Sequence, residues 1–309
     1  MQQEKSNEDH SRLFNITAKD LTAGNRRLVE VPYTATLSHA MNILVANSIS
    51  SLPVAAPPGH WIGAGGSMIM ESDRQTGAVR KHYIGILTML DILAHIAGGE
   101  HNLSDPTDLD RKMALPCWSV WKCLAKGYIE RWCQMLTQMD LLRFLRDHHS
   151  DDLKDVLSRS ISDLRAVNES VYAVTASTSV SNAIKSMKAA LLNAVPIVHA
   201  PEVAEEDHLQ LINGRHRKVI GTFSATDLKA CRLLELQAWL PLSALEFTEK
   251  VSGNERETVS CTEEASMEEA IEKVVTRRVH RVWVVNHQGL LKGVVSLTDI
   301  IRSIRAALL

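Results

Sequence analysis

Five side chains near the C-terminal end could together bind a phosphorylated sugar. His280 and Arg281 stand at the start of an apolar stretch, and Ser296, Thr298 and Asp299 lie where a helix is expected to begin. A helix N-terminus carries unpaired N–H groups and partial positive charge, so it favours anions. An ionised aspartate can accept hydrogen bonds from vicinal hydroxyls, and the planar guanidinium of arginine suits phosphate. These residue types predict a nucleotide site rather than a reaction centre.

The same spacing also fits a purely structural role. A Ser or Thr followed three positions later by an acidic residue is a helix-capping signal, and most such pairs only start a helix. Repetition strengthens the ligand interpretation, because a Gly-x-x-Ser/Thr-x-x-Asp pattern occurs three times. Its hydroxyl and acidic members are Thr88 and Asp91, Ser224 and Asp227, and Ser296 and Asp299.

Each of these motifs closes one copy of a repeated unit. A short extended segment comes first, at 28–31, 171–174 and 258–261. A helix follows, with apolar residues at i, i+3, i+4 and i+7. These are Leu37, Ala40, Met41 and Leu44, then Val180, Ala183, Ile184 and Met187, and finally Met267, Ala270, Ile271 and Val274. A buried strand begins 15 residues after each helix start, at Leu52, Val195 and Val282, and a second strand ends in the motif. The register predicts an α/β repeat protein.

Composition excludes several other classes of protein. The net charge of −2 leaves no basic face for nucleic acid. Residues 1–12 are polar, so we expect a disordered tail and no signal peptide. The apolar run at 84–97 is too short to cross a bilayer, so no membrane partner is expected. Five cysteines without a CxxC pair indicate reduced thiols in the cytoplasm or nucleus, and their spacing fits no usual zinc site.

The β-α-β-β-α unit resembles the cystathionine-β-synthase (CBS) domain, which occurs in tandem pairs. Residues 280–285 (HRVWVV) and 293–299 (GVVSLTD) carry the resemblance, and residues 85–88 and 221–224 repeat part of it. Within this family the chain is most similar to the gamma-type regulatory subunits of the AMP-activated and sucrose-non-fermenting protein kinases, in their plant gamma-like branch. The similarity extends from about residue 28 to 305.

The resemblance implies two modules, each a pair of CBS repeats. The first would span 13–150, with repeat 1 at about 20–98 and a degenerate repeat 2 at about 110–148. The second would span 155–309, with repeat 3 at about 160–235 and repeat 4 at about 250–307. Only 49 residues separate Asp91 from Asp140, against 72 between Asp227 and Asp299. We therefore expect repeat 2 to be truncated, to lack its strands, and to be largely helical over 117–145.

In such pairs a nucleotide lies in the cleft between two repeats, so the missing strands should damage the N-terminal site. The basic pair His280–Arg281 corresponds to Asn193–Ala194 in repeat 3 and to Ser50–Ser51 in repeat 1. Phosphate can therefore be neutralised only in the C-terminal module. The predicted nucleotide-binding residues are Ser224, Asp227, His280, Arg281, Ser296, Thr298 and Asp299, with Thr88, Asp91, Thr137 and Asp140 as weaker candidates.

The resemblance implies a non-catalytic, gamma-type regulatory subunit of a Ser/Thr protein kinase heterotrimer. Its partners would be a catalytic (alpha) subunit and a beta-type scaffold subunit. AMP, ADP or ATP would be the ligand, with no cofactor, no metal and no catalytic residue. The alternative is an interaction scaffold of CBS fold that has lost nucleotide binding, because only one repeat keeps the cationic pair. An enzyme regulated by CBS repeats would need more chain outside the repeats than is present.

Three smaller features are assigned structural roles. Arg277 and Arg278 suit the C-terminal end of the helix that begins at Met267. Pro53 and Pro196 predict edge strands or irregular pairing, because proline cannot donate to a ladder. The segment 239–242 (WLPL) is expected to pack the linker between repeats 3 and 4 against the sheet.

Overall fold

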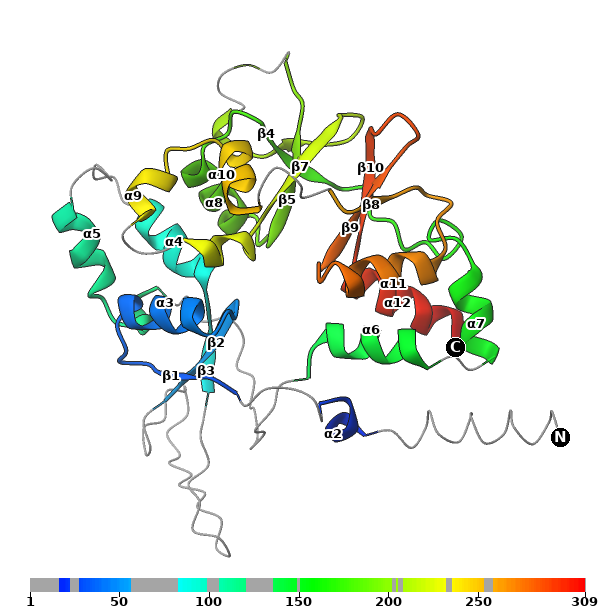
Figure 1. Cartoon of the computed structure of the whole chain (residues 1–309), viewed down its shortest axis with the longest axis horizontal. Helices are drawn as coiled ribbons and strands as arrows, with labels where there is room; N and C mark the ends of the chain where they lie inside the picture. Colours follow the sequence, from blue (N-terminus) through cyan, green and yellow to red (C-terminus); the bar gives the residue numbers. More distant parts are fainter. Residues whose placement is uncertain are drawn as a thin grey trace, which may run out of the picture.

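The computed structural model describes residues 17–22, 28–56, 83–98, 106–120, 136–148, 151–201, 204, 208–231, 235–252 and 258–308. Three separate sheets lie within these ranges, and each belongs to one of repeats 1, 3 and 4 (Figure 1). The chain therefore has the predicted α/β architecture of tandem repeats. Expectations for residues 1–12 and for 121–135 lie outside the described part. Among the described helices none is both long and apolar enough to span a membrane.

Repeat 1 forms a three-stranded sheet with helices beside it. Its strands have the order β1-β2-β3, with β1 parallel and β3 antiparallel to β2. The elements are β1 (Val31–Pro32), α3 (Leu37–Ala46), β2 (Ser51–Ala55), β3 (Tyr83–Thr88) and α4 (Met89–Ala97). The predicted stripe of α3 is buried, because residues three and four apart share one face of a helix.

Repeats 3 and 4 are built in the same way. Repeat 3 contains β4 (Tyr172–Thr175), α8 (Val180–Ala189), β5 (Ala194–Val198), β6 (Ile212–Asn213) and β7 (Val219–Ser224), in the order β6-β4-β5-β7. Repeat 4 contains β8 (Ser260–Cys261), α11 (Met267–Thr276), β9 (Arg281–Val285), β10 (Leu291–Ser296) and α12 (Leu297–Leu308), in the order β10-β9-β8. All predicted apolar positions of α8 and α11 are buried.

Repeat 3 departs from the pattern after its last strand. We expected Asp227 in the first turn of an α-helix, but a short 3-10 helix, η3 (Asp227–Ala230), occupies this place. Oγ of Ser224 accepts a hydrogen bond from the N–H of Thr226 at 3.1 Å. This hydrogen bond joins residues two positions apart and closes a turn. The side chain of a helix N-cap instead accepts a hydrogen bond from the backbone N–H of the second or third helical residue.

The linker after η3 packs as predicted. It contains α9 (Leu236–Trp239) and α10 (Ala244–Ser252). The ring of Trp239 meets that of Phe247 edge-on, with centroids 5.3 Å apart, and Phe247 meets Phe223 of β7 at 5.6 Å. Trp239 therefore connects the linker to the sheet through an intervening aromatic ring.

Within the described residues 106–120 and 136–148 the regular elements of repeat 2 are all helical. They are α5 (Pro106–Met113), the 3-10 helix η1 (Cys117–Ser119) and α6 (Gln138–Asp147). The helix α6 packs on α11 and α12 and buries Met139 and Leu142 in the core of repeat 4. Two further helices are α2 (Ala18–Leu21), near α6, and α7 (Asp151–Ser158), which also packs on repeat 4.

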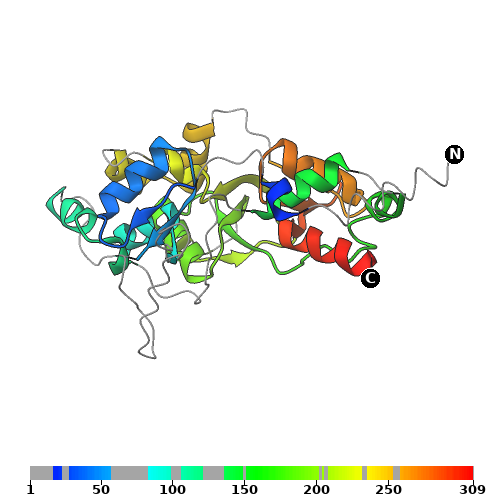
Figure 2. The same ribbon diagram turned by 90° about the horizontal axis from the view of Figure 1, so that it is seen from below.

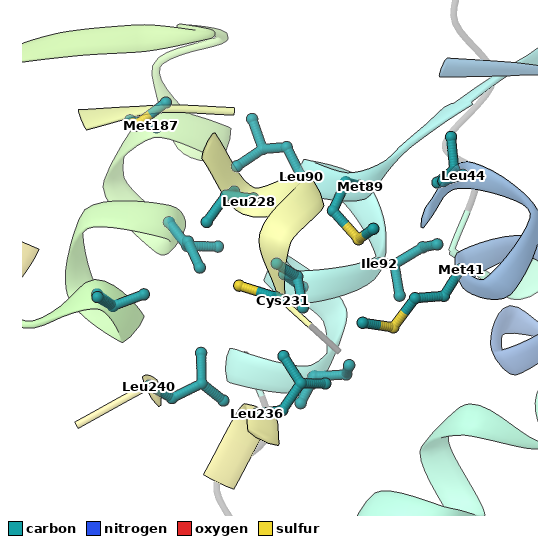
Figure 3. Close-up of a cluster of buried hydrophobic side chains, with 14 of the residues drawn as sticks. Met41, Leu44, Met89, Leu90, Ile92, Met187, Leu228, Cys231, Leu236 and Leu240 are labelled. Carbon is teal, nitrogen blue, oxygen red and sulfur yellow. The ribbon is translucent and has the colours of Figure 1, made fainter. Parts of the chain in front are cut away.

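Two of the three apolar cores contain the buried faces of helices, and the third lies between two sheets. The largest lies between repeats 1 and 3, where α4 packs on α8, and includes Met41, Met89 and Leu228 (Figure 3). Repeat 4 shares the second core with α6 and α7 at the other end of the molecule (Figure 2). The third core, with Trp283 and Leu291, joins the sheets of repeats 3 and 4.

The two prolines do not lie in edge strands. Pro53 is in β2 and Pro196 is in β5, and both strands are central in their sheets. The prediction of edge strands is wrong, but the pairing there is irregular. The parallel strands β1 and β4 pair with β2 and β5 only at residues that follow the proline. The N–H that proline lacks is therefore not needed for the parallel pairing.

Candidate functional site: a cationic cavity where three repeats meet

A cavity of about 370 Å³ lies where the central strands of repeats 1, 3 and 4 begin. The strands β2, β5 and β9 begin at Ser51, Ala194 and Arg281, and these residues line the cavity together with the residue before each of them. The volume lies near the lower end of the range of about 300–1,000 Å³ that is usual for small-molecule sites. The cavity therefore joins repeats 1, 3 and 4.

The same kind of backbone turn precedes the central strand in each of the three repeats. The helices α3, α8 and α11 are each followed by a residue of left-handed backbone conformation, namely Ser48, Leu191 and Arg278, with φ of 53°, 56° and 52°. In α11 the next N–H, that of Val279, donates to the carbonyl of Val274 at 3.1 Å, and the other two helices close in the same way. The turn ends the helix and directs the chain toward the cavity.

Arg281 is the most enclosed cation of the wall. Its Nη1 donates to the carbonyl oxygen of Ala194 at 2.7 Å, which ties repeat 4 to repeat 3. Its buried Nε has no hydrogen-bond partner among the described residues. Burial lowers the pKa of the guanidinium, although arginine stays charged at neutral pH. A partly satisfied, desolvated guanidinium is suited to bind an anion.

Lys229 adds to the positive potential near the cavity, and His280 adds to it only in its charged form. His280 is an exposed residue that lines the cavity, and its pKa is lowered by partial desolvation and then by the charges of Arg281 and Lys229. Desolvation also lowers the pKa of Lys229, against the opposing charge of Asp227, and its Nζ donates to the carbonyl of Ser48 at 3.4 Å. Bound phosphate would favour the charged form of His280, because opposite charges stabilise one another.

The rest of the wall supplies hydroxyl groups and apolar surface. Apolar side chains include Ile220, Leu245, Val259 and Trp283, and hydroxyl groups come from Ser50, Ser51, Thr88, Thr222, Ser224, Thr226, Thr248 and Thr258. The Trp283 side chain is buried, and its Nε1 donates to Oγ1 of Thr222 at 2.8 Å across the interface of repeats 3 and 4. A cavity with one cationic region and apolar walls suits a phosphorylated, planar ligand.

The structure places Asp299 in a helix cap and not on the cavity wall. One carboxylate oxygen accepts from the backbone N–H of Ser296 at 3.0 Å and from its hydroxyl at 2.5 Å. The other accepts from Arg302 at 2.9 Å. Thr298 accepts from Nε2 of Gln138 in α6 at 2.9 Å. Among the described residues that line the cavity, Ser296, Thr298 and Asp299 are absent, so the expectation that they share a crevice with His280 and Arg281 is not met.

The weaker candidates show the same capping geometry. Asp91 accepts from the N–H and the hydroxyl of Thr88 at 2.8 and 2.6 Å, and it also pairs with Lys188 of repeat 3. Asp140 accepts from the N–H and the hydroxyl of Thr137 at 2.8 and 2.7 Å, and from Arg143 at 3.3 Å.

Four of the eleven predicted residues therefore line the cavity, namely Thr88, Ser224, His280 and Arg281. Asp227 is buried and is not among the described lining residues. The cavity also contains Arg278 and Glu249, which the repeat pattern did not identify. The sequence could have indicated Arg278 as a site residue through its position two residues before His280. Glu249 lies on α10, outside the repeat motif, so no pattern pointed to it.

The described cysteines are all buried. Burial raises the pKa values of the thiols of Cys117, Cys231 and Cys261 to about 11, 12 and 11. Such thiols stay protonated and are poor nucleophiles. In the same described residues no cluster of His, Cys, Asp and Glu could hold a metal ion.

Comparison with known proteins agrees with the fold. The CBS domain family matches residues 254–306, most of repeat 4. A crystal structure from Methanocaldococcus jannaschii, of a proposed archaeal homologue of the gamma subunit of AMP-activated protein kinase, has a TM-score of 0.62 with this chain. It covers 93% of this chain and 99% of its own, at 16% identity, so it shows the fold alone. The molecule is a protein of tandem CBS repeats.

Two relatives from Arabidopsis thaliana define the family more closely. The SNF1-related protein kinase regulatory subunit gamma-like PV42a is 69% identical over 354 residues that cover all of both chains. The corresponding PV42b is 44% identical over 98% of both. The chain therefore belongs to the gamma-like regulatory subunits of SNF1-related protein kinase, whose members are named as regulatory and not as catalytic. The first alignment is longer than the 309 residues of this chain, so that relative has residues without a counterpart here.

Proposed function

We propose that this chain is the gamma-type subunit of a Ser/Thr kinase heterotrimer and that it senses adenine nucleotides in the cavity where repeats 1, 3 and 4 meet. The observation that carries the proposal is the convergence of His280 and Arg281 on a cavity with apolar walls. The names of its relatives support a kinase catalytic subunit as partner, and a beta-type scaffold subunit completes the proposed assembly.

The cavity suggests how a ligand would act on the kinase. Its wall combines Ser50, Ser51 and Thr88 of repeat 1 with residues of repeats 3 and 4. A ligand that contacts all three repeats stabilises the arrangement in which those contacts can form. It shifts the kinase only if it binds one arrangement more tightly than another.

Calorimetry of the full chain with AMP, ADP and ATP tests nucleotide binding. Arg281→Ala should weaken binding by about 1.5–3 kcal/mol, the scale of a hydrogen bond to a charged group. Arg281→Lys keeps the charge and should retain part of that affinity. Arg143→Ala is the matched control, because Arg143 pairs with Asp140 on α6 and does not line the cavity. Equal losses at both arginines would place the site elsewhere.

The second candidate is a CBS scaffold that binds no nucleotide. The capping roles of Asp91, Asp140 and Asp299 favour it, because these carboxylates are engaged within the protein. Absence of heat with all three nucleotides at millimolar concentration would select the scaffold. Co-expression with the kinase catalytic and beta-type subunits, followed by size-exclusion chromatography, tests the assembly independently of nucleotide. Failure to co-elute would refute the subunit role.

A further inference from the structure

Arg278 lies at the C-terminal end of α11 and also lines the cavity. Arg277 is the C-cap of α11, and Arg278 follows it with φ of 52°. This left-handed residue turns the chain toward β9, and Arg278 lines the cavity with His280 and Arg281. Arg277 is not among the described lining residues. Arg278 therefore lies next to the C-cap of α11, as expected, and also lines the cavity.

The equivalent positions of the other repeats do not supply such a side chain. Ser48 and Leu191 have the same left-handed conformation, and neither is among the described residues that line the cavity. That conformation favours glycine, because a Cβ crowds the backbone there. The left-handed conformation therefore does not itself favour an arginine, whereas the cavity gives the side chain a role.

The cations differ in depth. Arg281 is largely enclosed and bonded to Ala194, whereas Arg278 is exposed. Both guanidinium groups stay charged at neutral pH, and Lys229 lies close enough to His280 to influence its titration. Glu249 is the one carboxylate among the described lining residues. The two arginines against Glu249 leave the described lining with a net positive charge, and a triphosphate gains more from it than a monophosphate because it carries more negative charge.

We infer that Arg278 determines specificity, in that it makes the cavity prefer nucleoside di- and triphosphates to monophosphates. The inference rests on the proposed nucleotide site. The phosphate nearest the sugar would meet Arg281 in the enclosed part, and the terminal phosphates would extend toward Arg278. Because Arg278 is exposed, salt screens its contribution, and the preference for triphosphate should weaken as ionic strength rises.

Calorimetry with AMP, ADP and ATP on matched variants tests the inference. Arg278→Gly removes the side chain and suits the left-handed backbone. Leu191→Gly makes the same backbone change at an equivalent position that does not line the cavity, and Arg277→Ala removes a neighbouring charge. We expect Arg278→Gly to weaken ATP binding about three- to tenfold and AMP binding less than twofold, the range of an exposed charged contact. Both controls should bind as the wild type does.

The outcomes separate this inference from the proposed function. If the wild type binds no nucleotide, the proposed function fails and the inference fails with it. If the wild type binds but Arg278→Gly weakens AMP and ATP equally, or Arg277→Ala has the same effect, only the inference is overturned. Circular dichroism checks that each variant folds. Arg278→Gln, which keeps much of the side chain without its charge, provides the same comparison if the glycine variant does not fold.

Discussion

Replacing Gly293 by alanine should destabilise the protein much more than the same change at Gly221, although both glycines occupy the same position of the repeat. A Cβ on Gly293 would lie 2.5 Å from Cγ1 of Val167 and 2.8 Å from the carbonyl oxygen of Asn168. At Gly221 the nearest atom is Cδ1 of Ile197, at 3.3 Å, the tip of a flexible side chain. A backbone atom cannot move aside as easily as a side-chain methyl group.

The expected magnitude follows from what the new methyl group would displace. Overpacking costs about 1–3 kcal/mol. Asn168 also exchanges two hydrogen bonds with Val294, of 2.8 and 2.9 Å, and each contributes about 1 kcal/mol if it is lost. Alanine restricts the unfolded chain, which offsets about 0.4–1 kcal/mol. Gly293→Ala should therefore lower the free energy of unfolding by about 2 kcal/mol or more, and Gly221→Ala should change it by less than about 1 kcal/mol.

Urea denaturation followed by circular dichroism measures both effects. The midpoint should fall for Gly293→Ala with an unchanged slope, because the surface exposed on unfolding stays the same. Equal shifts for the two variants would refute the reasoning, since β10 would then not lie against residues 167–168 as described.

Three further predictions use the same protein. Burial lowers the pKa values of His95 and His280 below the usual 6.5. The charge of Lys112 adds to this effect for His95, and the charges of Arg281 and Lys229 add to it for His280. The unfolded chain then binds more protons below that pH, so stability should fall from about pH 7 to pH 5.5, and less so in a variant with glutamine at both positions. A double-mutant cycle of Trp283→Phe and Thr222→Val should give a coupling of about 0.5–1.5 kcal/mol, and zero coupling would mean that their bond does not form. The buried thiols of Cys117, Cys231 and Cys261 should react with iodoacetamide near neutral pH only after the protein is unfolded. Mass spectrometry would detect the modification, and modification of these thiols in the native protein would contradict their burial.

The sequence predicted the elements because their signals are local. The spacing of apolar residues in α3, α8 and α11 identified each buried face correctly, since a helix of 3.6 residues per turn brings those positions together. The strand entrances at Ser51, Ala194 and Arg281 were aligned correctly for the same reason, because they follow each helix at a constant distance.

The sequence could not distinguish a cap from a ligand group. The recurring Gly-x-x-Ser/Thr-x-x-Asp pattern favoured a ligand site because it repeats. A helix start must be capped in every copy, however, so capping explains the same repetition. The bonds of Asp91 and Asp299 within their own caps show which role these carboxylates have.

From the sequence alone came the repeat, its register, the CBS family and the cationic pair at His280 and Arg281, because these depend on spacing along the chain. Only the tertiary structure decided which side chains share a cavity. It brings Ser50 and Thr88 of repeat 1 to the same cavity as Arg281 of repeat 4, and it places Arg278 in the cavity lining. The physical reason is that such proximity depends on the packing of one repeat against another, and one-dimensional periodicity does not encode that packing.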